Sequence, residues 1–133
     1  MNLIFCLDDK NGMAFNHRRQ SRDRVLIDDL VQTINGAPLT LTPYSAKLFE
    51  GLAASLALSE KPLQTSGAGY CFVEETDPAP YQDRIDELIL YRWNRHYPAD
   101  VWCTLDLSGY RMHSTEEFVG SSHEKITKEV WKR

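Results

Sequence analysis

Residues 86–93 read Asp-Glu-Leu-Ile-Leu-Tyr-Arg-Trp, in which four apolar side chains follow two acids. This segment has two periodicities. Ile85, Leu88 and Ile89 are spaced as in a helix, whereas the residues up to Trp93 also alternate between two faces. We predict a strand that begins at Glu87. Residues 2–7, Asn-Leu-Ile-Phe-Cys-Leu, form a second apolar run, which is typical of a central strand covered on both faces.

The segments around these two runs predict an order of elements. Apolar residues from Val25 to Ile34 recur at helical spacing, and Asn35-Gly36 supplies a stop signal after the polar loop 16–24. We also expect a helix at 44–52 and strands at 39–42, 70–73, 101–105, 110–113 and 126–131, while periodicity leaves 53–58 open. Helices come early and strands crowd the C-terminal half. This order predicts an α/β fold, a mixed sheet with flanking helices and antiparallel C-terminal strands.

Composition narrows the class of protein. A chain of 133 residues can bury one core, so we expect residues 1–133 to form a single domain. The net charge of −4 argues against non-specific nucleic-acid binding, because phosphate backbones attract a basic surface. No apolar run approaches the roughly 18 residues of a membrane span. We therefore expect a cytoplasmic protein with neither a membrane nor a nucleic acid as its partner.

Cysteine and histidine spacing does not favour a metal site. Cys6, Cys71 and Cys103 are far apart in runs that are typical of buried strands, so we expect them to be core residues in a reducing compartment. The sequence has no CxxC or HExxH motif, and its four histidines are mutually remote. We predict no bound metal.

Several segments together resemble the dihydrofolate reductase-like family. The matching segments are residues 2–13, residues 33–42 with Pro38 before a strand, residues 86–92, 97–100 and 116–118, and the final strand through Trp131. They cover roughly two thirds of the chain, so the chain resembles a compact, divergent member. The resemblance implies the family's mixed sheet, together with NADPH-dependent reduction of a pterin-like substrate.

The sequence departs from the family's pattern at its cofactor and substrate positions. Glu74-Glu75 stand where the family has adjacent glycines beside the cofactor pyrophosphate, and two carboxylates would repel that group. Residues 42–45 replace the family's phosphate-engaging Gly-Arg-x-Thr. We therefore expect the classical NADPH site to be lost and leave the cofactor unknown. Asp23 and Asp28 are the acids nearest to the position of the family's carboxylate in the first helix.

The polar loop offers a candidate anion site. Arg18, Arg19 and Arg22 put forked guanidinium donors on one segment, next to Asn16, which suits carboxylate or phosphate. Ion pairs with Asp23, Asp28 and Asp29 on a solvated loop would explain the same residues.

His123 is the second candidate. It follows Ser121 and Ser122 in a loop of small residues, where an imidazole suits a general base and a neighbouring serine supplies a hydroxyl. A polar hairpin loop is the alternative.

We expect this loop and the arginine-rich loop to converge on one concave site. A surface imidazole should be dispensable for folding, at under about 1 kcal/mol for His123→Ala, whereas Trp131 should be packed.

Three functions follow from these residues. The leading hypothesis is a dihydrofolate reductase-like protein without the classical NADPH site, which binds an anionic or heterocyclic small ligand, a protein partner or a second copy of itself. A divergent NAD(P)H-dependent reductase of a pterin-like substrate is the first alternative. A small hydrolase that uses His123 with Asp23 or Asp8 is the second.

Overall fold

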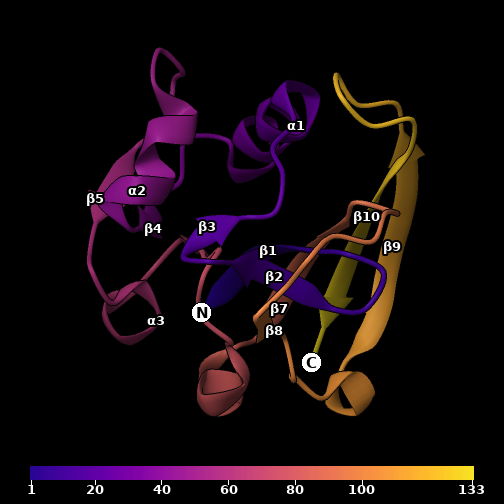
Figure 1. The fold of residues 1–133 in the computed structure, drawn as a ribbon. Helices are drawn as coiled ribbons and strands as arrows, with labels where there is room; N and C mark the ends of the chain where they lie inside the picture. The colour runs from indigo at the N-terminus through magenta and orange to yellow at the C-terminus, as the bar shows by residue number, and fades with distance from the viewer.

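A seven-stranded mixed sheet organises the computed structural model, which describes residues 1–133 (Figure 1). Its strand order is β5 (Leu56–Leu58), β4 (Leu39–Leu41), β6 (Tyr70–Phe72), β1 (Asn2–Leu7), β7 (Glu87–Arg92), β10 (Ile126–Lys132) and β9 (Arg111–Phe118). The first five strands in this order run parallel, and β10 is antiparallel to both of its neighbours. The predicted α/β fold with an antiparallel C-terminal edge is confirmed.

A smaller sheet covers part of this framework. Its order is β3 (Arg18–Arg19), β2 (Gly12–Phe15) and β8 (Val101–Trp102). β2 and β3 form a hairpin through Asn16 and His17, whose φ angles of 52° and 59° are those of a tight hairpin turn. The segment predicted as a loop over 16–24 therefore begins as a hairpin, and only residues 20–23 connect it to the next helix.

The helices are short except for one. α1 (Arg24–Ile34) begins one residue before the predicted apolar stretch and is capped at its C-terminus by Asn35, which adopts the left-handed conformation at φ 45°. The helix predicted over 44–52 is instead α2 (Pro43–Ala46) followed by the 3-10 turn η1 (Lys47–Phe49). α3 (Pro62–Thr65), η2 (Ala79–Arg84) and η3 (Leu107–Gly109) lie in connections. None of these helices is long and apolar enough to span a membrane.

Two hydrophobic cores lie on opposite faces of the main sheet. Successive residues of a strand point to opposite faces, so Ile4 of β1 joins the cluster under α1 while Leu3 and Phe5 join the other cluster. α1 contributes Leu26 and Leu30 to the first cluster. The apolar runs of β1 and β7 thus reflect strands that are covered on both sides. Figure 1 shows α1 between the β4–β5 edge and the β9–β10 hairpin.

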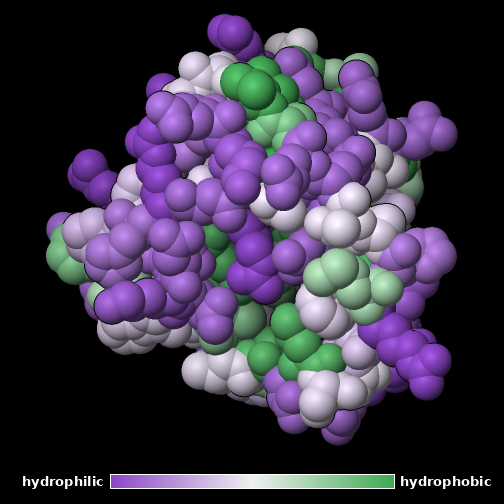
Figure 2. Space-filling model, turned by 90° about the vertical axis from the view of Figure 1, so that its right-hand side faces the viewer, coloured by the Kyte–Doolittle hydropathy of each residue, from purple (hydrophilic) through white to green (hydrophobic).

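Several local expectations are corrected. β8 ends at Trp102, so Cys103 follows a strand rather than lying in one, and Cys6 is only partly buried. β9 extends to Phe118, well past the predicted end at His113, with seven exposed residues. Trp131 is partly exposed, but it packs against the second core cluster, as predicted. The face seen in Figure 2 is mainly hydrophilic, with small separate hydrophobic areas.

Burial makes two cysteines unreactive. Burial raises the pKa of the Cys71 thiol to about 12 and that of Cys103 to about 11. Because the thiolate is the reactive form, both side chains behave as small apolar core residues.

Candidate functional site

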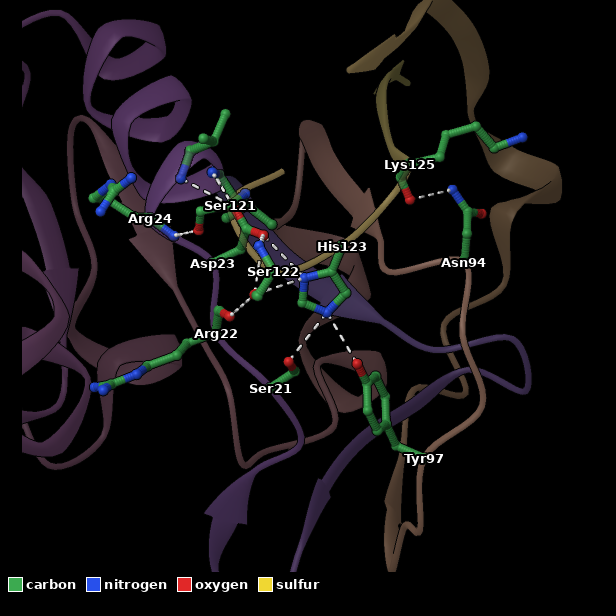
Figure 3. Close-up of polar contacts among 12 residues, drawn as sticks. Ser21, Arg22, Asp23, Arg24, Asn94, Tyr97, Ser121, Ser122, His123 and Lys125 are labelled. Carbon is green, nitrogen blue, oxygen red and sulfur yellow. Dashed lines mark hydrogen bonds and ion pairs between the residues drawn. The ribbon is translucent and has the colours of Figure 1, made fainter. Parts of the chain in front are cut away.

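Two loops that are about a hundred residues apart in sequence meet at the N-terminus of α1 (Figure 3). Ser122 Oγ donates to the carbonyl oxygen of Arg22 at 3.0 Å, and the N–H of Arg24 donates to Ser121 Oγ, also at 3.0 Å. The end of the arginine-rich loop and the loop before β10 therefore converge, as expected. Their junction is organised around one carboxylate.

Asp23 is that carboxylate, and its side chain is fully buried. It caps α1, since its Oδ1 accepts from the N–H groups of Val25 and Leu26 at 2.9 and 3.2 Å. The N–H groups of Ser121 and Ser122 donate to the same carboxylate at 3.0 and 2.9 Å. Burial pushes the pKa of Asp23 upward, but these hydrogen bonds and one from His123 outweigh it and hold the pKa well below the usual range. Asp23 is thus an ionised hub that joins the two loops.

His123 lies in the interior, which corrects the expectation of a surface imidazole. Its side chain is 1% exposed, and its ring stacks on Trp93 with the centroids 4.5 Å apart. Nδ1 lies 3.0 Å from Asp23 Oδ2. On the opposite side of the ring, Nε2 lies 2.9 Å from the Tyr97 hydroxyl and 3.1 Å from Ser21 Oγ (Figure 3). The imidazole is buried because aromatic and charged groups from three distant segments surround it.

Of the two serines expected beside His123, Ser122 contacts the imidazole, but on its Nδ1 side. Ser122 Oγ is 3.1 Å from Nδ1, and Ser121 binds the helix N-terminus, so neither hydroxyl faces Nε2. Ser21 takes that position, although nothing in the sequence around it separates it from the other polar residues of its loop. Tyr97 belonged to a segment that supported the family resemblance, but its hydroxyl carried no functional signal. Only the fold brings these two side chains to one nitrogen.

The absence of a side chain at Gly120 leaves room for the Asp23 carboxylate. A Cβ atom added at Gly120 would overlap the Asp23 carboxylate and crowd Ile126. We expect Gly120→Ala to destabilise the protein by about 2 kcal/mol, as overpacking a filled site does. Gly109→Ala is the matched control, because a Cβ there meets nothing within 4 Å. Urea unfolding of both variants checks this, and equal midpoints would contradict it.

One arginine of the polar loop, Arg19, is held by partners within the protein. Arg19 pairs with Glu74 through two hydrogen bonds of 2.8 and 3.0 Å and lies over the Tyr44 ring, so it is not free for a ligand. Its partner is Glu74 and not one of the expected aspartates. Asp29 instead accepts from Tyr91 and pairs with Lys128.

Three recesses surround this junction. The largest, of about 580 Å³, lies between α1, η1 and Ser121–Ser122, and we call it the α1 cleft. Its lining includes Arg22, Asp23, Arg24, Ile27, Asp28, Lys47, Leu48, Glu50, Leu52, Ser121 and Ser122. A second recess, of about 300 Å³, is lined by residues 42–45, Glu60, Pro62 and residues 72–76. A third recess, of about 250 Å³, holds Asn16, Arg18 and Arg19. Most of the site residues predicted from sequence are therefore divided between two of the recesses, and His123 lines none of the three.

The remaining acid of interest, Asp8, has a different environment. Its carboxylate accepts from the N–H groups of Lys10 and Gly12 at 2.8 and 2.7 Å and from the Gln20 side chain at 3.0 Å. Burial raises the pKa of Asp8, but these hydrogen bonds outweigh that effect and lower it overall. No contact joins Asp8 to His123, so it does not form the predicted pair. Nor do three histidine, cysteine or acidic side chains cluster as a set of metal ligands.

Comparison with known proteins identifies the fold. No family model matches the sequence, and no curated protein matches it. Among solved structures, dihydrofolate reductase from Enterococcus faecalis, complexed with NADP(H) and RAB-propyl, is similar with a TM-score of 0.68. The match covers 99% of this chain and 95% of that chain, at 10% sequence identity. The chain has a dihydrofolate reductase-like fold, as the sequence predicted.

Proposed function

We propose that this dihydrofolate reductase-like domain binds a small anionic ligand in the α1 cleft and does not bind NADPH. The observation that carries the proposal is the cationic lining of the cleft. Arg22, Arg24 and Lys47 line it, and none of the three forms an ion pair within the protein. Forked guanidinium groups that lack an internal partner are suited to a carboxylate or phosphate.

The other lining residues refine the ligand class. The ionised Asp23, Asp28 and Glu50 equal the three cationic side chains of the cleft in number. The Asp23 carboxylate, however, is fully buried and accepts from backbone N–H groups, so the exposed part of the lining holds three cations and two carboxylates. Ile27, Leu48 and Leu52 supply apolar surface on the same walls. A ligand with an anionic group and an apolar or heterocyclic body matches this combination better than a bare inorganic ion does.

The lining of the second recess supports the proposal that the protein does not bind NADPH. It contains both segments that correspond, by family resemblance, to the cofactor's phosphate contacts, residues 42–45 and Glu74-Glu75. Its lining has three glutamates and neither lysine nor arginine. The nearby Arg19 donates to Glu74 Oε2. The Ser45 hydroxyl donates to the other carboxylate oxygen, Glu74 Oε1, at 2.7 Å. These residues do not fit a pyrophosphate, which disfavours the reductase alternative.

Titration calorimetry with NADPH tests the cofactor part of the proposal. We expect a dissociation constant weaker than about 10 μM, which corresponds to a binding free energy of roughly −7 kcal/mol. Tighter binding would contradict the proposal and support a working reductase.

A thermal-shift series tests the α1 cleft with folate, 4-hydroxybenzoate and inorganic phosphate as anionic probes. We expect at least one organic anion to raise the melting temperature of the wild type, and the shift to fall by more than half in Arg22→Ala/Arg24→Ala. Arg111→Ala, on the exposed strand β9, is the matched control and should retain the full shift. Equal shifts in all three proteins, or no shift with any probe, would refute the cleft as an anion site.

A further inference from the structure

We propose that Ser21 is a nucleophile activated by His123, with Asp23 positioning the imidazole, and that the domain thereby hydrolyses small esters. The assignment rests on a continuous chain of contacts. Asp23 Oδ2 lies 3.0 Å from His123 Nδ1, and His123 Nε2 lies 3.1 Å from Ser21 Oγ (Figure 3). Both distances fall within the range that links a nucleophile to its base and the base to its orienting group.

The electrostatics determine which nitrogen of His123 can act. Asp23 is held ionised by backbone N–H donors, so the proton of a neutral imidazole is favoured on Nδ1, beside the carboxylate. Nε2 is then the free acceptor, and it faces the Ser21 hydroxyl. The Tyr97 hydroxyl, 2.9 Å away, shares this nitrogen. When Nε2 becomes protonated, the Tyr97 oxygen can accept its hydrogen and stabilise the imidazolium.

Ser21 is reachable although His123 is buried. Ser21 is half-buried and lines a narrow inner recess with Cys6, Glu74 and Trp93. This recess and the α1 cleft share four lining residues, Arg22, Asp23, Ile27 and Leu48, so the two adjoin. The recess holds about 10 Å³, roughly one water molecule, so it has room for the water of deacylation but not for an acyl group, which must reach Ser21 from the adjoining α1 cleft.

Backbone donors lie beside the nucleophile. The N–H groups of Ser21 and Arg22 donate to no acceptor within the protein, in contrast to those of Arg24, Val25 and Leu26. The amide of the nucleophilic residue is a standard donor to the oxyanion in acyl transfer. Ser21 therefore has a base, a positioning carboxylate and unpaired amides within its own segment.

The reaction proceeds in two balanced steps. Ser21 Oγ bonds to the ester carbonyl carbon while its proton passes to Nε2. The carbon–oxygen bond to the alcohol then breaks, and Nε2 returns the proton to the departing oxygen. Water next attacks the acyl-serine, gives a proton to Nε2, and Ser21 leaves and regains that proton. The products are a carboxylic acid and an alcohol, and no redox partner is needed.

The substrate class is an ester whose alcohol carries an anion. The ester follows from the contact between Ser21 and His123, and the anion follows from Arg22 and Arg24 in the adjoining cleft. This second element rests on the proposed function, whereas the serine chemistry does not.

The first experiment uses 4-nitrophenyl acetate and peptide mass spectrometry. We expect the wild type to release nitrophenolate at least a hundredfold faster than Ser21→Ala and to carry an acetyl group on Ser21. Ser21→Ala removes one hydroxyl, so its melting temperature should stay close to that of the wild type. Ser114→Ala, at an exposed serine on β9, is the matched control and should react as the wild type does. Tyr97→Phe should still be acylated, because the Ser21 to Nε2 contact remains.

Three results would overturn the serine chemistry: no hydrolysis above buffer, an acetyl group on another residue, or equal rates in wild type and Ser21→Ala.

The second experiment compares 4-acetoxybenzoate with 4-nitrophenyl acetate in wild type and Arg22→Ala/Arg24→Ala. A loss of more than tenfold confined to the anionic ester supports the substrate class. An equal effect on both esters rejects the substrate class and leaves the acylation of Ser21 intact. The thermal-shift series with anionic probes is repeated on Ser21→Ala. If the anions still raise its melting temperature, the cleft binds anions whether or not Ser21 is a nucleophile.

Discussion

His123→Ala is expected to destabilise the domain by about 3–5 kcal/mol, because truncating a buried ring leaves a cavity and unpairs its buried hydrogen-bond partners. The substitution removes the stacking on Trp93 and leaves a cavity beside it. It also leaves the buried Asp23 carboxylate without its imidazole donor and the Tyr97 hydroxyl without its acceptor. Urea unfolding followed by circular dichroism measures the change. This value replaces the small cost expected from sequence.

Trp131→Ala provides the comparison for this measurement. Trp131 is partly exposed at the end of β10, so its loss should cost less than about 3 kcal/mol, below the range for a fully buried tryptophan. His123→Ala should therefore unfold at a lower urea concentration than Trp131→Ala. The reverse order would show that the imidazole contributes little to folding.

Asp23→Ala is expected to cost about 3–5 kcal/mol, because one substitution removes the cap of α1 and unpairs several buried donors. The N–H groups of Val25, Leu26, Ser121 and Ser122 all lose their acceptor. Asp23→Asn keeps one oxygen for the helix cap but turns an amide donor toward the Ser122 N–H or the His123 ring. Asn should therefore be milder than Ala yet still clearly destabilising. A cost below about 1 kcal/mol for Asp23→Ala would refute the role of a hub.

Asp23 also makes the free energy of unfolding depend on pH. Its pKa in the folded state lies below the ordinary carboxyl value of about 3.9, so the unfolded chain binds a proton first as pH falls. The stabilisation is complete above about pH 5 and is lost progressively as pH falls through and below about 4. The pKa of Asp8 is lowered too and adds to the same slope. Urea melts from pH 6 to pH 3 should show a smaller loss in Asp23→Asn than in wild type.

The sequence by itself determined the elements whose pattern is local. The apolar runs of β1 and β7 identify strands that are buried on both faces, since such burial requires apolar residues at every position. The helical spacing and the Asn35-Gly36 stop define α1 to within a residue at each end. Together with the order of segments, these patterns predict a mixed α/β sheet with an antiparallel C-terminal edge. The dihydrofolate reductase-like fold came from the resemblance of several segments to that family.

Elements that depend on pairing rather than pattern were not visible in the sequence. β9 has seven exposed residues and no alternation of apolar side chains, and its length follows from hydrogen bonding to β10. The predicted 44–52 helix is interrupted after four residues, because the chain turns through η1. Intrinsic preference is weak in such short segments, so tertiary contacts decide their conformation.

Asp23 and His123 were selected from sequence as titratable groups, but only the tertiary structure decided what surrounds them. Burial of His123 depends on Trp93, and the facing hydroxyls come from Ser21 and Tyr97, about a hundred and about twenty-six residues away in sequence. Likewise, the sequence identifies Glu74 as a carboxylate but not its partner Arg19, which only the fold brings within hydrogen-bonding distance. Periodicity reports which face of an element is apolar. It does not report which side chains from other elements meet there, because that depends on packing of the whole chain.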